Sequence, residues 1–465
     1  MKNSLTRGRQ TMSERRTRIG LTAILLLALT FRLYWVLIAH PRPSLEGGDG
    51  PYYLSLGWAI ALPASTEDLL NLGMMATGPV YPLYLSAFFA DPPDFVRYGP
   101  RRYIDFDRSM QMPHVLPAAQ TARVGQAMVD VLTCLLIFHS GKRLFGARTG
   151  LLAALAFALD LRFVTQTGAI NTETLFIFLL VSGVWAFVAA RSATRWQVIG
   201  YAAAAILLLL AAFTRAVALP LIALFALLPL LPRPTRPQLI GAGLIVGVGL
   251  LMVGAWVVRN YQATGQVVII SDGFGSNFWM GSRLDGQWHG IIEFDKERAD
   301  LQSRYGGRDA YVEDALRTIA ADPAAYVRLL FVKVTSAYLQ PYGTVVYPGE
   351  SLKELAAQVL RGERSLAELV NGEAFWPKLI VYIFHYTGLI GGLIGLWLAR
   401  RDWLKVLPLL LPILYFTVAY TLLTIIPRYI FPTMPFYTIL AAYAGVTTFS
   451  KVAGERNKRQ TANAK

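Results

Sequence analysis

Two carboxylates stand in a glycine-rich turn that follows the first apolar stretch of the chain. Residues 45–53 read LEGGDGPYY and contain Glu46 and Asp49. A carboxylate held just outside lipid is partly removed from water, which makes it a better base. Asp49 also precedes Gly-Pro and a predicted helix from Pro51, so a helix-capping role explains it equally well.

A third carboxylate opens a long apolar run. Residues 170–174 read INTET, and Glu173 abuts the apolar segment 175–181. Burying an acid beside such a run is costly, so we expect Glu173 to face a cavity or the outer surface. The alternative is an acid at a helix N-terminus, where the helix dipole contributes about 0.3–1 kcal/mol. Asp160 and Arg162 lie nearby and are expected to pair with each other.

Three arginines adjoin apolar runs on the same predicted side of the membrane. They are Arg215, Arg259 and Arg428. A guanidinium fork matches the oxygens of a phosphate better than an ammonium group does. Snorkelling to lipid headgroups would explain any one of them. Three at comparable depth favour an anionic headgroup as ligand.

The elements that position these residues are predicted to be membrane-spanning helices. Of 465 residues, 54% are apolar and 16% charged, which excludes an ordinary soluble globular protein. Ten apolar runs are long enough to cross the membrane. They cover 19–39, 115–140, 149–166, 171–190, 197–213, 216–232, 238–258, 377–399, 404–424 and 429–449. We therefore expect an all-α polytopic membrane protein with two larger outer loops.

The distribution of charge orients this bundle. The short segments on the side of the two termini contain 21 basic and three acidic residues. The loops 40–114 and 259–325 on the other side contain 5 basic and 8 acidic, and 7 basic and 10 acidic residues. By the positive-inside rule the termini are cytoplasmic. The net charge of +15 then reflects topology, and no nucleic-acid partner is expected.

The predicted organisation has five parts. They are a basic N-terminus 1–18, a transmembrane module 19–258 with the first outer loop 40–114, an extracytoplasmic segment 259–376, C-terminal transmembrane helices 377–449 and a basic tail 450–465. Within the extracytoplasmic segment, 326–342 is interrupted by Arg328 and Lys333. We interpret it as an interfacial or re-entrant helix.

Other kinds of chemistry find little support in the sequence. The lone Cys134 excludes a disulfide framework, and the five histidines lack the spacing of a zinc site. No phosphate-binding glycine loop or G-x-S-x-G nucleophile motif is present. Outer-side carboxylates and arginines on a lipid-embedded bundle suit a substrate with a polyprenyl tail and a phosphate.

At these residues the sequence resembles the GT-C superfamily of membrane glycosyltransferases, in particular the protein O-mannosyltransferase and aminoarabinose transferase family. The resemblance rests on the order and spacing of several motifs along most of the chain. They are Asp49-Gly50-Pro51-Tyr52-Tyr53, Thr77-Gly78-Pro79-Val80-Tyr81-Pro82-Leu83, Arg123 with Gln126, Lys142-Arg143-Leu144-Phe145-Gly146, Glu173, Trp256-Val257-Val258-Arg259-Asn260-Tyr261, and Arg428-Tyr429-Ile430-Phe431-Pro432.

The resemblance implies an inverting transferase at the extracytoplasmic face of a bacterial inner membrane. Its donor would be a polyprenyl-phosphate sugar, and its acceptor a glycan, lipid or protein. Asp49 would be the base and Glu173 an assisting acid. The substrate-binding candidates are Glu46, Tyr53, Tyr81, Arg215, Arg259, Arg428 and Tyr429. No cofactor is predicted, although some members of the superfamily use a divalent cation. Gly50 departs from the Glu of many relatives, and Glu46 is the candidate substitute.

Two other functions remain open at this point. A lipid or sugar transporter is also a polytopic bundle with buried charges, although transporters usually show repeated halves, and none is visible here. An oligosaccharide ligase or polymerase shares the topology and the lipid-phosphate donor. In that case Arg283 or Arg304 would be essential and Asp49 dispensable.

The predicted orientation has a direct test. A reporter fused after Pro51 should lie outside the cytosol, because the first span follows a basic N-terminus. A fusion after Gly146 serves as the cytosolic control. Alkaline phosphatase activity measured in intact cells should be high for the first fusion and low for the second, and the reverse would overturn the topology.

Overall fold

The computed structural model describes most of the chain. The described residues are 2–43, 49–61, 77–89, 115–193, 195–271, 273–285, 300–301, 303 and 310–463. Throughout these ranges the regular structure is helical. The predicted all-α polytopic membrane fold is confirmed.

Within the described residues, eight helical segments are long and apolar enough to cross a membrane. They lie in α1 (Lys2–Tyr34) with the π-helical turn Trp35–Ala39, α6 (Val115–Phe145), α9 (Glu173–Arg191), α10 (Gln197–Thr214), α12 (Arg236–Thr264), α19 (Phe375–Leu398), α20 (Trp403–Leu422), and α21 (Pro427–Ile430) continuing into α22 (Met434–Asn463). The other two predicted spans correspond to shorter apolar helices: α7 (Ala147–Leu159), and α11 (Leu219–Leu227) with its flanking 3-10 turns.

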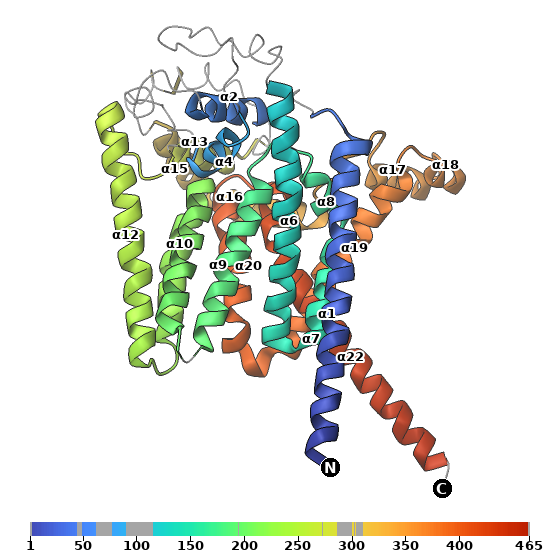
Figure 1. Ribbon diagram of the computed structural model, residues 1–465. Helices are drawn as coiled ribbons and strands as arrows, with labels where there is room; N and C mark the ends of the chain where they lie inside the picture. The colour runs from blue at the N-terminus through green and yellow to red at the C-terminus, as the bar shows by residue number, and fades with distance from the viewer. Residues whose placement is uncertain are drawn as a thin grey trace.

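The loop helices gather at one end of the bundle, and both termini lie at the other end (Figure 1). This group consists of α2 (Gly50–Ala61), α4 (Val80–Ser86), α13 (Phe274–Ser282) and α15 (Ala310–Ala321). Two further short helices, α17 (Leu352–Leu360) and α18 (Leu366–Val370), project sideways from the bundle near the same end. Both large loops therefore contribute to the same face.

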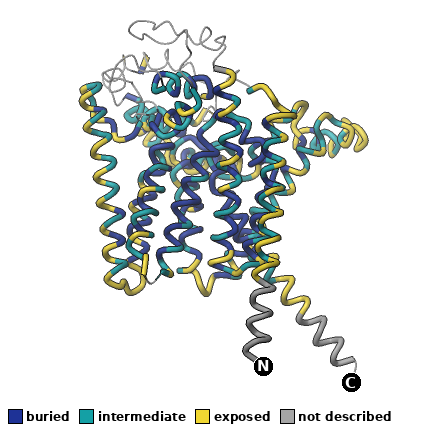
Figure 2. The backbone as a smooth tube through the Cα atoms, in the orientation of Figure 1, coloured by how far each residue is buried: buried dark blue, intermediate teal, exposed yellow. Residues whose placement is uncertain are grey.

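Helix α9 forms the centre of the core. Its sequence is apolar on all sides, as expected for a helix without a solvent face. It packs against α6, α10 and α20, and most of its residues are buried (Figure 2). Gly183 permits a close approach of α10, because a Cβ there would lie 2.7 Å from Leu208 Cγ. Whatever stands at the start of α9 is therefore held on a rigid element.

The predicted span 149–166 is not one continuous helix. It breaks at Asp160 into α7 and α8 (Leu161–Gln166), so the prediction was wrong at this point. Asp160 caps α8 by accepting a hydrogen bond from the Arg162 backbone at 3.0 Å. The Arg162 guanidinium also pairs with the Asp160 carboxylate at 2.6 Å. The helix is thus interrupted at an aspartate that caps α8 and pairs with Arg162. The apolar pattern of this run does not reveal the interruption.

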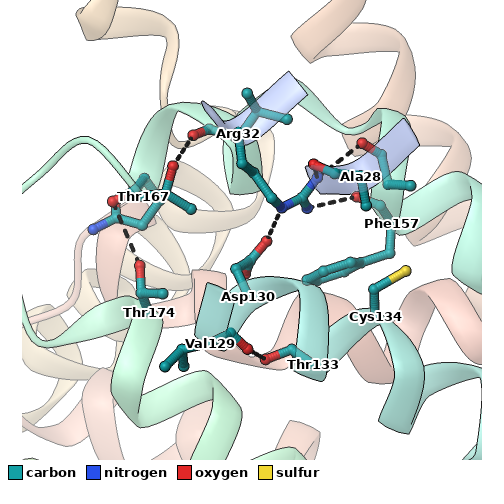
Figure 3. A network of polar contacts seen from close by, with 12 residues as sticks. Ala28, Arg32, Val129, Asp130, Thr133, Cys134, Phe157, Thr167 and Thr174 are labelled. Atoms are coloured by element: carbon teal, nitrogen blue, oxygen red, sulfur yellow. Dashed lines mark hydrogen bonds and ion pairs between the residues drawn. The ribbon is translucent and has the colours of Figure 1, made fainter. Parts of the chain in front are cut away.

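A buried arginine satisfies carbonyls that this break leaves without helical partners. Arg32 on α1 donates to Ala158 O at 3.1 Å and Phe157 O at 3.4 Å. The same guanidinium pairs with Asp130 on α6 (Figure 3). Lipid offers no hydrogen bonds, so such groups must be satisfied within the protein. Arg32 therefore joins α1, α6 and α7.

The segment predicted to be interfacial forms α16 (Pro323–Leu339). Asp322 caps its start by accepting a hydrogen bond from Ala325 N at 2.8 Å. Within the described chain, α16 is not among the helices long and apolar enough to span a membrane. Its position at the membrane interface stays a prediction.

The Arg32–Asp130 pair can be tested by substitution. Arg32→Met should leave the buried Asp130 carboxylate without its cation, and losing one partner of a buried pair costs about 3–5 kcal/mol. The double variant Arg32→Met with Asp130→Leu removes both charges and should recover part of that loss. Thermal unfolding in detergent measures both. A double variant no more stable than the single would show that the carbonyl contacts, and not the charge pair, dominate.

Candidate functional site

Glu173 is the first residue of α9 and is fully buried. Its carboxylate accepts hydrogen bonds from Arg428 Nε at 2.5 Å and Arg428 Nη2 at 3.2 Å. Arg215 Nη1 donates to the same carboxylate at 3.1 Å. The expectation that Glu173 faces a cavity or the outer surface was therefore wrong. Two guanidinium groups, and not exposure, compensate for its charge.

Asp49 completes the cluster from the segment that is predicted to be the first outer loop. Its backbone oxygen accepts the first hydrogen bond of α2, from Tyr53 N at 3.0 Å. Its side chain is 55% exposed and accepts a hydrogen bond from Arg428 Nη1 at 3.3 Å. Asp49 thus stands at a helix start while its carboxylate faces an arginine. We call Asp49, Glu173, Arg215 and Arg428 the Glu173 cluster; its two acids and two arginines balance in charge.

Aromatic rings fix the orientation of Arg215. Its guanidinium carbon lies 5.7 Å from the Phe176 ring centre and 5.3 Å from that of Tyr429. Tyr429 in turn stacks on Tyr420 at 4.8 Å. A cation over ring faces is attracted by their negative charge density. Tyr429 therefore supports the cluster from the element that also carries Arg428.

Two tyrosines of the first outer loop lie beside the cluster. Tyr53 on α2 and Tyr81 on α4 meet edge to face, with ring centres 5.1 Å apart. Burial, reinforced by the negative charge of Asp49, raises the pKa of Tyr53 to about 12. Its hydroxyl therefore keeps its proton at neutral pH and can act as a donor.

A buried glutamine positions the segment that leads into Glu173. Gln126 on α6 accepts a hydrogen bond from the Tyr81 hydroxyl at 2.8 Å. Its amide nitrogen donates to Thr167 O at 3.0 Å and Ala169 O at 2.8 Å. One side chain thus ties α4 and α6 to the residues just before α9.

Two glycines allow the first outer loop to approach the bundle closely. A Cβ at Gly78 would lie 1.9 Å from the backbone oxygen of Phe213, two residues before Arg215. A Cβ at Gly50 would lie 3.1 Å from Ile170 O, three residues before Glu173. Gly50 therefore stands where the backbone segment ahead of Glu173 leaves little room for a side chain.

Two predicted site residues are not joined to the cluster by the contacts described. Arg259 at the end of α12 donates to Asn260 at 3.0 Å and lies over the Trp256 ring at 5.0 Å. The prediction that it acts together with Arg215 and Arg428 finds no direct contact in support.

Glu46 lies outside the described residues, and so does Arg304. Arg283 pairs with Asp285 at 2.6 Å.

A family model for dolichyl-phosphate-mannose-protein mannosyltransferases matches residues 118–257. The matched segment contains Glu173 and Arg215, whereas Asp49 and Arg428 lie outside it. A search of curated proteins finds no match.

Among solved structures, the chain is similar to the oligosaccharyltransferase AglB of Archaeoglobus fulgidus in complex with an inhibitory peptide and a dolichol-phosphate. The TM-score is 0.52 at 16% identity, over 95% of this chain and 52% of that chain. A complex of the same enzyme with Zn and sulfate gives 0.50 at 15%, over 92% and 49%. This chain therefore spans about half the length of the enzyme it matches. ArnT of Cupriavidus metallidurans bound to undecaprenyl phosphate gives 0.37 at 13%, over 92% and 77%.

The chain has the GT-C fold. The resemblance inferred from the sequence is confirmed in the fold and in the family-model match over residues 118–257. At these identities the structural likeness concerns the fold alone, so the roles of individual residues are argued from the geometry of this chain.

The described residues of the cluster do not fit a divalent cation. Both oxygens of Glu173 are engaged by arginines, and Asp49 also faces Arg428. Across the described ranges, no group of three or more His, Cys, Asp or Glu residues stands close enough to hold a metal ion. A hard cation needs several free oxygen ligands. We therefore derive no step through a metal.

The sequence did not indicate how the segment before Arg428 is held. Lys333 on α16 is fully buried and donates to Gly281 O at 2.8 Å and Leu423 O at 2.6 Å. Thr424 Oγ1 donates to Asn277 O at 3.0 Å. These bonds tie α13 of the second outer loop to residues 423–424. A lysine interrupting an apolar stretch was the available signal, since a buried cation requires acceptors.

Lys333 makes the stability of this region depend on pH. Burial lowers the pKa of its ammonium group to about 7, whereas a free lysine titrates near 10.4. Between these values the unfolded chain binds a proton that the folded chain lacks, so stability rises with pH across this window. Wild-type protein should therefore gain melting temperature from pH 7 to pH 10 relative to Lys333→Met. Identical slopes for the two proteins in thermal unfolding would refute this assignment.

Proposed function

We propose that this GT-C protein transfers a sugar from a polyprenyl-phosphate donor to an extracytoplasmic acceptor, with inversion. The observation that carries the proposal is the Glu173 cluster: an exposed carboxylate and a buried one joined by the same arginine. Its elements come from both halves of the chain and meet at the face where the loop helices gather. One acid is free to accept a proton, and two cations are available for a leaving phosphate.

The proposed reaction is a single displacement. Asp49 accepts the proton of the acceptor hydroxyl as its oxygen attacks the anomeric carbon. The bond from that carbon to the phosphate oxygen breaks, and its electrons remain on the phosphate. Cations held in place where this charge develops lower the barrier, because they need no reorganisation during the reaction.

Arg428 is the best candidate to receive the donor phosphate. Two of its nitrogens are bound to Glu173, and the third contacts Asp49 at 3.3 Å, the longest of these contacts. A phosphate oxygen could replace the Asp49 carboxylate at this nitrogen. That exchange would release Asp49 towards the acceptor at the moment the donor binds. Arg215 would add a second cation on the same side.

The proposed role of Glu173 is to position the arginines. Its carboxylate is buried and fully engaged, so direct contact with the acceptor would require the arginines to leave. A buried acid bound by two guanidinium groups instead fixes both of them next to the start of α9. Tyr53, with its proton retained, is suited to donate a hydrogen bond to either substrate.

The chemistry is tested by comparing two variants of the cluster. Asp49→Asn should lower the turnover rate by about 10²–10⁴-fold, the usual contribution of a general base, while donor binding is kept. Arg428→Gln should weaken binding of undecaprenyl phosphate itself, because the phosphate loses a charge-assisted partner. The measurements are transfer from a panel of undecaprenyl-phosphate monosaccharides and binding of undecaprenyl phosphate to purified protein.

Arg259→Gln is the matched control, since it removes an outer-side arginine that has no described contact with the cluster. It should leave phosphate binding near the wild-type level.

Wild-type turnover in Asp49→Asn would overturn the assignment of the base. Product formed by detergent-purified protein, without a membrane gradient, excludes a pure transporter. If the Arg283→Gln variant lost activity while the Asp49→Asn variant kept it, the result would favour a ligase or polymerase.

A further inference from the structure

A cavity of about 440 Å³ opens at the end of the bundle opposite the Glu173 cluster. Its walls come from the end of α6, the end of α9, and the start of α20 with the preceding 3-10 turn Arg400–Asp402. These helix ends lie at the same end of the bundle as the two termini (Figure 1). The cavity is therefore separate from the proposed catalytic site.

The charge of this cavity is strongly unbalanced. Four basic side chains line it, Arg143, Arg191, Arg401 and Lys405, against the single carboxylate of Asp402. Among the ion pairs described for this chain, none joins any of these four cations to a carboxylate. An uncompensated group of cations around one cavity attracts an anion.

Two of the cations are held in fixed orientations. Arg143 donates from Nε to Ser192 Oγ at 2.7 Å and from Nη2 to Ala189 O at 3.1 Å. Arg191 donates from Nη1 to Leu404 O at 2.8 Å. Each guanidinium has five N–H groups, so donors remain for a ligand. Arg401 and Lys405 are exposed and can close over a bound group from the rim.

The rest of the lining is apolar, which favours a lipid over a fully hydrated ion. Leu144, Val188 and Pro408 contribute to it, and Trp403 stands at the opening with half of its surface exposed. Tryptophan is common at the level of lipid headgroups, and the cavity lies where three apolar helices end. Basic pockets between transmembrane helices on the cytoplasmic side are suited to acidic headgroups.

We propose that this cavity binds the phosphate-bearing headgroup of an anionic membrane lipid. The phosphate lies between Arg143 and Arg191, and the glycerol and the upper acyl chains lie along the apolar wall beside Trp403. The bound lipid would connect the ends of α6 and α9 to the start of α20. A small soluble phosphate shares the charge chemistry but would leave the apolar wall uncovered.

The test uses delipidated full-length protein in detergent, titrated with phosphatidylglycerol and monitored by native mass spectrometry. The variant Arg401→Glu with Lys405→Glu should weaken binding by about 25-fold or more, since each basic residue near an acidic lipid contributes roughly 5-fold. The matched control, Arg400→Glu with Lys451→Glu, makes the same change in net charge with residues that do not line the cavity. It should bind as the wild type does.

A second readout locates the lipid without changing any charge. Brominated phosphatidylglycerol should quench the fluorescence of wild-type protein more than that of Trp403→Phe, and brominated phosphatidylcholine should quench both equally. An equal loss of phosphatidylglycerol binding in the two charge variants would overturn the proposal, because it would indicate that the lipid is attracted by the overall positive charge and not by this cavity. Competition by inorganic phosphate as strong as that by phosphatidylglycerol would overturn it in favour of a soluble anion.

Discussion

A fully buried carboxylate must be neutralised inside the protein, and at Glu173 this requirement organises the end of the bundle where the loop helices gather. The cations come from Arg215, between two apolar helices, and from Arg428, which lies 255 residues after Glu173 in the chain. Each must reach the start of α9, so the ends of α10 and α20 converge there. The close approach at Gly78 and the bonds of Gln126 fix the first outer loop against the same point.

Backbone carbonyls, and not only carboxylates, accept hydrogen bonds from three other buried cations of the described chain. Arg32 donates to carbonyls at the end of α7, Lys333 to the carbonyl that follows α20, and Lys378 to Pro348 O, Gly349 O and Glu350 O at 2.6–3.0 Å. The carbonyls that bind Lys378 belong to an exposed turn before α17, whereas for Arg32 and Lys333 helical backbone stops inside the bundle or at its edge. An apolar environment leaves such carbonyls without water, and a long cationic side chain supplies the donors.

Much of the fold was predictable from the sequence, because apolar runs encode helix length and loop charge encodes orientation. The acid and two of the three arginines were recognisable because a charge beside an apolar run needs a partner. Which arginines meet that acid was not predictable: Arg215, Arg259 and Arg428 look alike in sequence, and only packing separates Arg259 from the others. The sequence analysis also missed the break at Asp160. The apolar pattern continues across this position, and the contacts between Asp160 and Arg162 are visible only in the structure.

Gly50 limits which side chains the position next to Asp49 can accept. A side chain at this position would press on Ile170 O, and that segment would have to yield by a few tenths of an ångström. The displaced backbone leads within three residues to Glu173, so introducing an acid next to Asp49 would disturb the arginine anchor at the same time. An acid beside Asp49 would therefore act on Glu173 through the backbone as well as through its charge.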